Sequence, residues 1–153
     1  MSEMLANHYF MVRNYLSAQE EYEAVLSKMP DNKNARKRLV ICYTQTGRVK
    51  QAIQLFNELI AVDINFIIDT NPVRDDCPCP ELIEKIEARK GINTDTVDFN
   101  LIMGIIWLYC DAARSIEFFL HARELSPDDI SIDTAINAIH DYLDSRNLAG
   151  NAL

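Results

Sequence analysis

The sequence has few residues that interrupt a helix. Of its 153 residues, four are glycine and five are proline, and nearly all of them fall at segment boundaries, which favours an all-helical chain over a β sandwich. Long apolar runs are also lacking. The longest, residues 99–110, contains Asn100 and Gly104 and is shorter than the ~18 residues that span a bilayer. Residues 1–10 show no basic region followed by an apolar run and a cleavage site. We therefore expect a soluble, cytoplasmic protein with no membrane partner.

Catalytic motifs are absent as well. The three histidines fall in three different predicted helices. The chain has no glycine-rich phosphate loop, no nucleophile at a strand-to-helix turn and no His-Glu-x-x-His motif. We therefore expect that the protein is not an enzyme and uses no cofactor.

The four cysteines include the closely spaced pair Cys77 and Cys79. Two thiolates could bind zinc with a histidine, but structural zinc sites usually place two or more residues between paired cysteines and need a second pair. A disulfide across one intervening proline would be strained. We expect reduced thiols and no metal, and keep a thiol or metal-binding role for this pair as an alternative. Cys42 and Cys110 fall in predicted helix interiors and are expected to be small core residues.

Residues 34–62 predict two helices joined by Gly47. Apolar residues recur at three- and four-residue spacings on one face of each half, and glycine can adopt the positive φ that ends a helix and reverses the chain. The same pattern occurs once before this segment and again near the C-terminus. Corresponding positions are Leu5, Ala6, Tyr9, Ala18, Tyr22 and Pro30, then Leu39, Val40, Tyr43, Ala52 and Phe56, then Phe99, Ile102, Met103, Ile106, Ser115, Phe119, Ala122 and Pro127.

A helix-turn-helix pattern with a period of about 34 residues resembles the tetratricopeptide repeat. The resemblance implies an all-α fold, an α-solenoid of three such units within a single domain over residues 1–146. An apolar stripe near the C-terminus predicts a helix that caps the last unit. The predicted parts are units at about 1–32, 33–66 and 96–129, an inserted loop and helix at 67–95, a capping helix at 129–144 and a frayed tail at 147–153.

The insertion begins where the second unit departs from the pattern. Ile64 replaces the closing proline, and apolar residues continue at helical spacing, so we expect this helix to run to about Ile68 and to be the longest in the protein. Three prolines in residues 69–80 predict a loop. Pro80 is then expected to begin a short helix that ends near Lys90 and packs against the solenoid.

The first helices of tetratricopeptide repeats line a concave groove, so the resemblance assigns partner contacts to these helices. It implies a non-catalytic adaptor that binds a protein or peptide. Members of the family with a carboxylate clamp bind chaperone C-termini, but that pattern is matched here at Asn7 alone and fails at Glu3, Arg38, Val97 and Leu101. The assigned groove residues are Asn7, Phe10, Met11, Asn34, Lys37, Ile41, Thr44, Gln45, Asn100, Gly104, Trp107 and Leu108.

Charge is unevenly distributed along the chain. Residues 28–50 contain seven basic residues and one acidic residue, a local charge of +6. Because the net charge of the protein is −8, the rest of the chain carries a charge of −14. So acidic a protein is a poor partner for nucleic acid. The basic segment could still contact an acidic peptide, although it could equally be a solvated helix start balanced by nearby glutamates.

Residues 99–110 are apolar almost all the way round a helix, which one buried face cannot explain. We expect the inserted segment 64–92 to cover the remaining side, with Phe66, Ile67, Leu82 and Ile86 as the covering residues. The alternative is an open patch in which Trp107 anchors a partner or a second copy of the chain. Self-assembly as a structural subunit is thus the alternative to an adaptor function.

Overall fold

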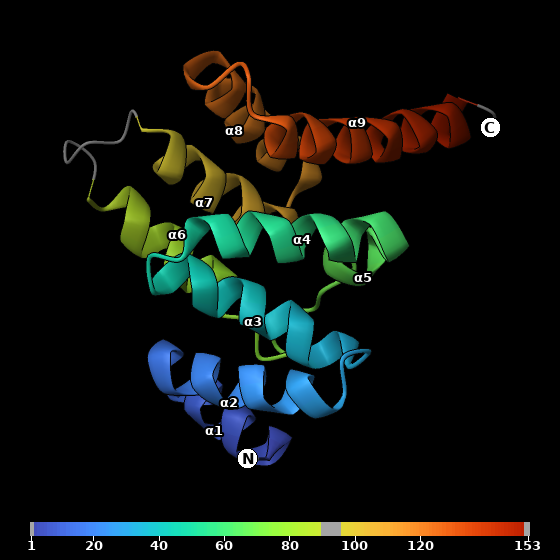
Figure 1. The fold of residues 1–153 in the computed structure, drawn as a ribbon. Coiled ribbons are helices and arrows are strands. Elements are labelled where there is room, and N and C mark those ends of the chain that lie inside the picture. The colour runs from blue at the N-terminus through green and yellow to red at the C-terminus, as the bar shows by residue number, and fades with distance from the viewer. Residues whose placement is uncertain (1, 90–95, 152–153) are drawn as a thin grey trace. The chain divides into compact units, whose positions relative to one another are not determined.

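The computed structural model describes residues 2–89 and 96–151, and these residues form α-helices with no β-strand among them, which confirms the all-α prediction. Helices that follow one another in the chain pack in pairs (Figure 1). The helices are α1 (Glu3–Met11), α2 (Tyr15–Lys28), α3 (Lys33–Gln45), α4 (Val49–Asp63), α5 (Asn65–Ile68), α6 (Cys79–Glu87), α7 (Val97–Leu108), α8 (Ala112–Leu125) and α9 (Ile130–Asn151). No helix among the described residues combines the length and the apolar character that a bilayer span requires.

The chain forms two compact units, residues 1–59 and 60–153, whose boundary lies within α4. In the N-terminal unit, α1 packs on α2 and α2 packs on α3. Asn14 and Asn32 cap α2 and α3, because each side-chain oxygen accepts a hydrogen bond from a backbone N–H in the first turn, at 3.2 and 3.1 Å. The single domain over residues 1–146 stays a prediction.

Two turns of the N-terminal unit contain a residue with positive φ, in the left-handed region of the Ramachandran plot. Gly47, after α3, has φ +80°, as its place in the sequence predicts. Arg13 holds the equivalent position of the first predicted unit, between α1 and α2, and has φ +63° although it carries a side chain. Both hairpins of this unit therefore reverse direction at equivalent positions.

The small residues of the repeat pattern are fully buried. Ala18, Ala52 and Ser115 each have no solvent-exposed surface. The aromatic positions one turn later, Tyr22, Phe56 and Phe119, are buried to the same extent. Only a small side chain at the first position lets the helices approach closely enough for the aromatic ring to pack.

The C-terminal unit is a series of helices in which α6 packs on α7, α7 on α8 and α8 on α9. The contact between α7 and α8 centres on Gly104, where an added Cβ would lie 2.8–3.0 Å from three atoms of the Phe119 ring. The Ser115 hydroxyl donates a hydrogen bond to the Gly104 carbonyl at 2.5 Å. Ser115 occupies the position that alanine holds in the other units, and its hydroxyl therefore has a hydrogen-bond partner on α7.

The prediction of one long helix ending at Ile68 is wrong. Helix α4 ends at Asp63, and a separate short helix, α5, begins at Asn65. The Asp63 carboxylate accepts a hydrogen bond from the Asn65 backbone N–H at 3.1 Å, a local bond that competes with helical hydrogen bonding. The longest helix in the described part of the chain is α9, with 22 residues.

The C-terminal helix is also longer than predicted, because α9 continues to Asn151 through residues that we expected to be frayed. The predicted helix after the loop is confirmed as α6, although it begins at Cys79 and ends at Glu87. Lys90 lies outside the described residues.

The buried small position of the second unit leads to a prediction on stability. Ala52→Leu should lower the free energy of unfolding by about 1–3 kcal/mol, because the larger side chain has no space between the paired helices. Urea denaturation followed by circular dichroism measures this loss. Ala113→Leu is the matched control, since Ala113 is exposed on α8, and it should change stability by less than about 0.5 kcal/mol. Equal losses in both variants would contradict the repeat packing.

The close contact at Gly104 leads to a second prediction. Gly104→Ala should favour the helix by ~1 kcal/mol but overpack Phe119 by about 1–3 kcal/mol, so that stability falls. In a Phe119→Leu background, which removes part of the ring, the same substitution should no longer destabilise. A higher melting temperature for Gly104→Ala in the wild-type background would show that Phe119 does not restrict this position.

Candidate partner-binding surface

Helices α1 and α3 are joined by two side-chain hydrogen bonds. Arg38 Nη1 donates to Asn7 Oδ1 at 2.7 Å, and Asn32 Nδ2 donates to Glu3 Oε2 at 3.0 Å. These are the first helices of the first two predicted units, and the bonds lie one turn apart on α1. The two helices therefore present one shared surface, which we call the α1–α3 face.

An aromatic cluster supports this face. The Phe10 ring is buried, and the rings of Tyr15 and Tyr22 meet it edge-on at centroid distances of 6.2 and 6.3 Å. The guanidinium carbon of Arg38 lies 5.2 Å from the centre of the Phe10 ring. This distance permits a cation–π interaction, so Arg38 is held by both Asn7 and Phe10.

Asn7 connects three helices through its side-chain oxygen. That oxygen accepts hydrogen bonds from Arg38 and, at 2.5 Å, from the Tyr22 hydroxyl on α2. Burial raises the pKa of Tyr22 to about 12, although its hydrogen bond and charge interaction with Arg38 act in the opposite direction. The phenol therefore stays protonated and keeps donating to Asn7 at neutral pH.

The structure divides the predicted groove residues of the N-terminal unit into two groups. Met11 and Asn34 are exposed, and Asn7, Lys37 and Gln45 are half-buried. The other three, Phe10, Ile41 and Thr44, are buried. Phe10 packs among aromatic rings, and the Thr44 hydroxyl donates to the Ile41 carbonyl at 2.6 Å, so these residues support the fold.

Most predicted groove residues of α7 are also buried. Asn100, Gly104 and Leu108 are covered, and Asn100 donates from Nδ2 to the Thr96 carbonyl at 2.8 Å. Their assignment to the groove stays a prediction, and we do not include these buried residues in the candidate surface. Trp107 is half-buried, with the guanidinium carbon of Arg114 5.2 Å from its ring centre.

The segment 99–110 is mainly buried, so the alternative of an open apolar patch is wrong. Helix α6 packs on α7, and Leu82 and Ile83 of α6 are buried. The prediction that the insertion covers α7 is confirmed for this helix. Of the other covering residues, Ile67 is buried, whereas Phe66 and Ile86 keep part of their surface exposed.

The cysteines occupy different environments and are all free thiols. Cys42 is buried as predicted, and burial raises the pKa of its thiol to about 12. The prediction for Cys110 is wrong, because α7 ends at Leu108 and leaves this residue exposed in the turn. Over residues 2–89 and 96–151, no three side chains of the metal-binding types come together as a site.

Sequence reasoning missed the role of Arg38 in joining α1 to α3. In the sequence, Arg38 is a mismatch to a family motif and part of the basic segment. The available signal was the position of Arg38 on the same helix face as Asn34, at i+4 spacing.

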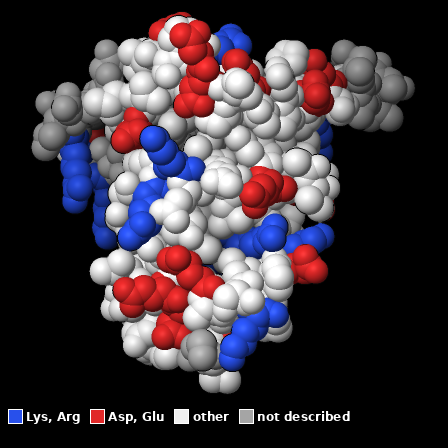
Figure 2. Space-filling view, viewed as in Figure 1, with Lys and Arg blue, Asp and Glu red and all other residues white. Residues whose placement is uncertain are grey.

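Figure 2 shows carboxylates gathered over α2, with basic side chains at the edge of this group. The uneven charge of the sequence is therefore visible on the surface of the N-terminal unit.

A comparison with family models matches residues 9–64 to the tetratricopeptide repeat. The match covers most of the first predicted unit and nearly all of the second. The third predicted unit, residues 96–129, lies outside it. Comparisons with curated proteins and with solved structures found no match.

The bonds of Arg38 lead to a prediction. Arg38→Met keeps most of the apolar stem but removes the hydrogen bond to Asn7 and the cation over Phe10, and should lower the free energy of unfolding by about 1–3 kcal/mol. Arg36→Met is the matched control, because Arg36 is also half-buried on α3 but forms no ion pair with any described residue. Chemical denaturation of both variants tests this difference, and equal stabilities would contradict it.

Proposed function

Because residues 9–64 belong to the tetratricopeptide repeat family, whose members are generally protein–protein interaction modules, we propose that the chain is a non-catalytic adaptor that binds a partner protein or peptide. The α1–α3 face is the proposed contact surface of its N-terminal unit. The observation that carries this assignment is the hydrogen bonding of Asn7. Its oxygen is held by two donors, while its amide nitrogen donates to none of the described residues.

A fixed amide donor suits recognition of a peptide backbone, because it is already oriented before the ligand arrives. On α3, Asn34 adds an exposed amide and Lys37 adds an ammonium group, and Met11 adds an exposed apolar side chain on α1. Together these groups can donate hydrogen bonds to carbonyls and carboxylates while contacting apolar atoms. The surface is thus suited to an extended, acidic peptide segment.

The positive charge of α3 favours a partner with negative charge. Most of the local +6 of residues 28–50 comes from this helix and its ends, and complementary charge speeds association and favours acidic partners. Nucleic acid is not the partner that we propose, because its phosphates would also meet the acidic remainder of the chain.

Self-assembly is the second candidate function, and exposed apolar residues at the N-terminus favour it. Met4, Met11 and Val12 on and after α1, and Leu16 on α2, are 81, 60, 59 and 56% exposed. Exposed apolar side chains that lie close together often mark a contact with another protein chain. Light scattering over a range of concentrations tests this candidate, since a monomer at all concentrations would exclude it.

The proposed contact predicts the effect of reversing one charge. A library of acidic peptides is screened with the wild-type protein, and the strongest binder is titrated by fluorescence anisotropy. Lys37→Glu should weaken this binding about tenfold and reduce its dependence on salt. We choose Lys37 rather than Arg38 because Arg38 also holds α1 to α3.

Lys50→Glu provides the control. It makes the same charge change at an exposed position on α4, away from the α1–α3 face. Its affinity should stay within about threefold of wild type, apart from the general effect of net charge. Equal losses in the two variants would mean that the peptide responds to overall charge rather than to this surface.

A further inference from the structure

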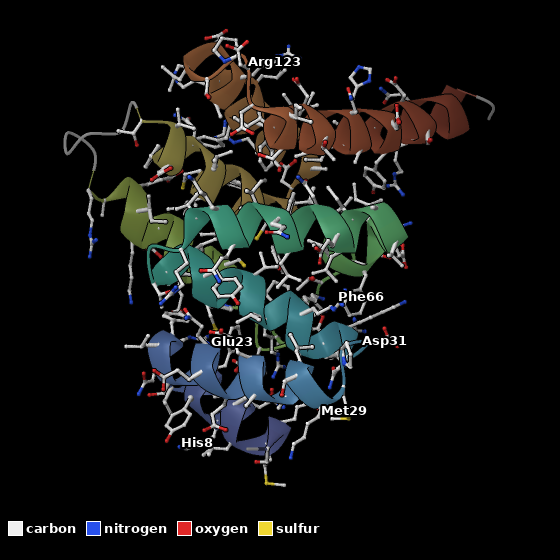
Figure 3. All side chains as sticks on the ribbon, in the orientation of Figure 1. His8, Glu23, Met29, Asp31, Phe66 and Arg123 are labelled. Atoms are coloured by element: carbon white, nitrogen blue, oxygen red, sulfur yellow. The ribbon has the colours of Figure 1, made fainter. Side chains whose placement is uncertain are left out.

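The N-terminal unit contains a hollow that belongs neither to the α1–α3 face nor to any predicted site. It has a volume of about 410 Å³ and lies between α2, α3 and α4, which falls within the range of ~300–1,000 Å³ typical of ligand sites. Its floor is formed by the apolar side chains of Leu26, Leu39 and Leu55 and by Tyr43. Figure 3 labels Glu23, which borders the hollow between α2 and α3.

Tyr43 contributes a polar group to this floor. The residue is only 7% exposed, and its hydroxyl forms no hydrogen bond with any described residue. Burial, followed by the nearby negative charge of Glu23, raises the pKa of this phenol, so it is a neutral donor at physiological pH. A ligand acceptor in the hollow would satisfy it.

The rim carries charges that the protein leaves without ion pairs. Glu23 on α2 and Glu58 on α4 are exposed, Arg36 on α3 is half-buried, and none of the three forms an ion pair within the described part of the chain. Two carboxylates against one guanidinium give the rim an excess of negative charge. It therefore favours a cationic group beside whatever fills the apolar floor.

The remaining rim groups suit a polypeptide. Gln51 and Gln54 border the hollow and carry amides that can both donate to and accept from a peptide backbone. The Gln51 oxygen accepts from Arg48 at 3.2 Å, which leaves its nitrogen as a donor. The arrangement combines an apolar floor, amide groups and acidic residues along three helices.

We infer that this hollow binds a short segment of a partner protein that inserts one large apolar side chain beside a lysine or arginine. The apolar side chain covers the leucines of the floor, and a backbone carbonyl of the segment accepts the hydrogen bond of Tyr43. The basic side chain lies between Glu23 and Glu58. This site rests on the proposed adaptor function and adds a second contact to it, with the opposite charge preference from the α1–α3 face.

The test uses the full chain and three fluorescein-labelled peptides in an anisotropy titration. The first has one phenylalanine flanked by lysines in a glycine and serine background. The second replaces the lysines with glutamates, and the third replaces the phenylalanine with serine. The first should bind at least about tenfold more tightly than either of the others. Equal binding of all three, no binding of the first, or tighter binding of the glutamate peptide would overturn the inference.

Two matched pairs of variants locate the binding. Tyr43→Phe and Glu58→Gln should each weaken the lysine peptide by about three- to tenfold. Tyr9→Phe removes the hydroxyl of the equivalent tyrosine in the first predicted unit, and Glu20→Gln removes an exposed carboxylate of α2 outside the hollow. These controls should leave the affinity unchanged. Losses equal to those of the hollow variants would overturn the location.

Both hollow variants change only a few atoms, and circular dichroism checks that they keep the helical content of the wild type. Lys37→Glu separates this site from the α1–α3 face, because it should leave binding of the lysine peptide intact. If Lys37→Glu abolished that binding, the peptide would occupy the α1–α3 face and the inference would be wrong. The proposed adaptor function would survive this result.

Discussion

Close approach of paired helices at small side chains is the constraint on which both units depend. Alanine at positions 18 and 52, and serine at position 115, leave space for an aromatic ring one turn later. In the C-terminal unit the same closeness forces the partner helix to carry Gly104 against Phe119. Since each hairpin is fixed at such a point, the first helices of neighbouring hairpins in the N-terminal unit come to lie where Arg38 can reach Asn7. A surface for a partner is thus a consequence of packing at small residues.

The sequence predicts the regular part of the fold well, because helix periodicity and end signals agree there. Helix α2 spans Tyr15–Lys28, as the apolar spacing and the following Met29 and Pro30 indicate. Prediction failed where one side chain decides the outcome. Where α4 ends, within a run of apolar residues, the carboxylate of Asp63 accepts a hydrogen bond from the Asn65 N–H. A periodic pattern contains no information about such a competing bond.

The candidate site was less predictable, because a position in the repeat does not show what covers a side chain. The repeat pattern places Phe10 and Thr44 on the expected helix face, yet both side chains are buried. Phe10 is covered by aromatic rings from α2. For α7 the failure has another cause, since a helix that is apolar on every side gives no preferred direction. The hollow beside Tyr43 was missed because three helices contribute to it, and linear spacing relates residues of one helix at a time.

The left-handed backbone conformation of Arg13 limits which side chains fit at position 13 without strain. Glycine occupies the equivalent position of the second unit without a steric cost, whereas a residue with a Cβ in this conformation costs roughly 1–2 kcal/mol. Arg13 offsets part of that cost, because its Nη1 donates to the Phe10 carbonyl at 3.2 Å. Glycine, asparagine or a side chain long enough to fold back on α1 therefore suits position 13, and a branched residue such as valine would be strained there.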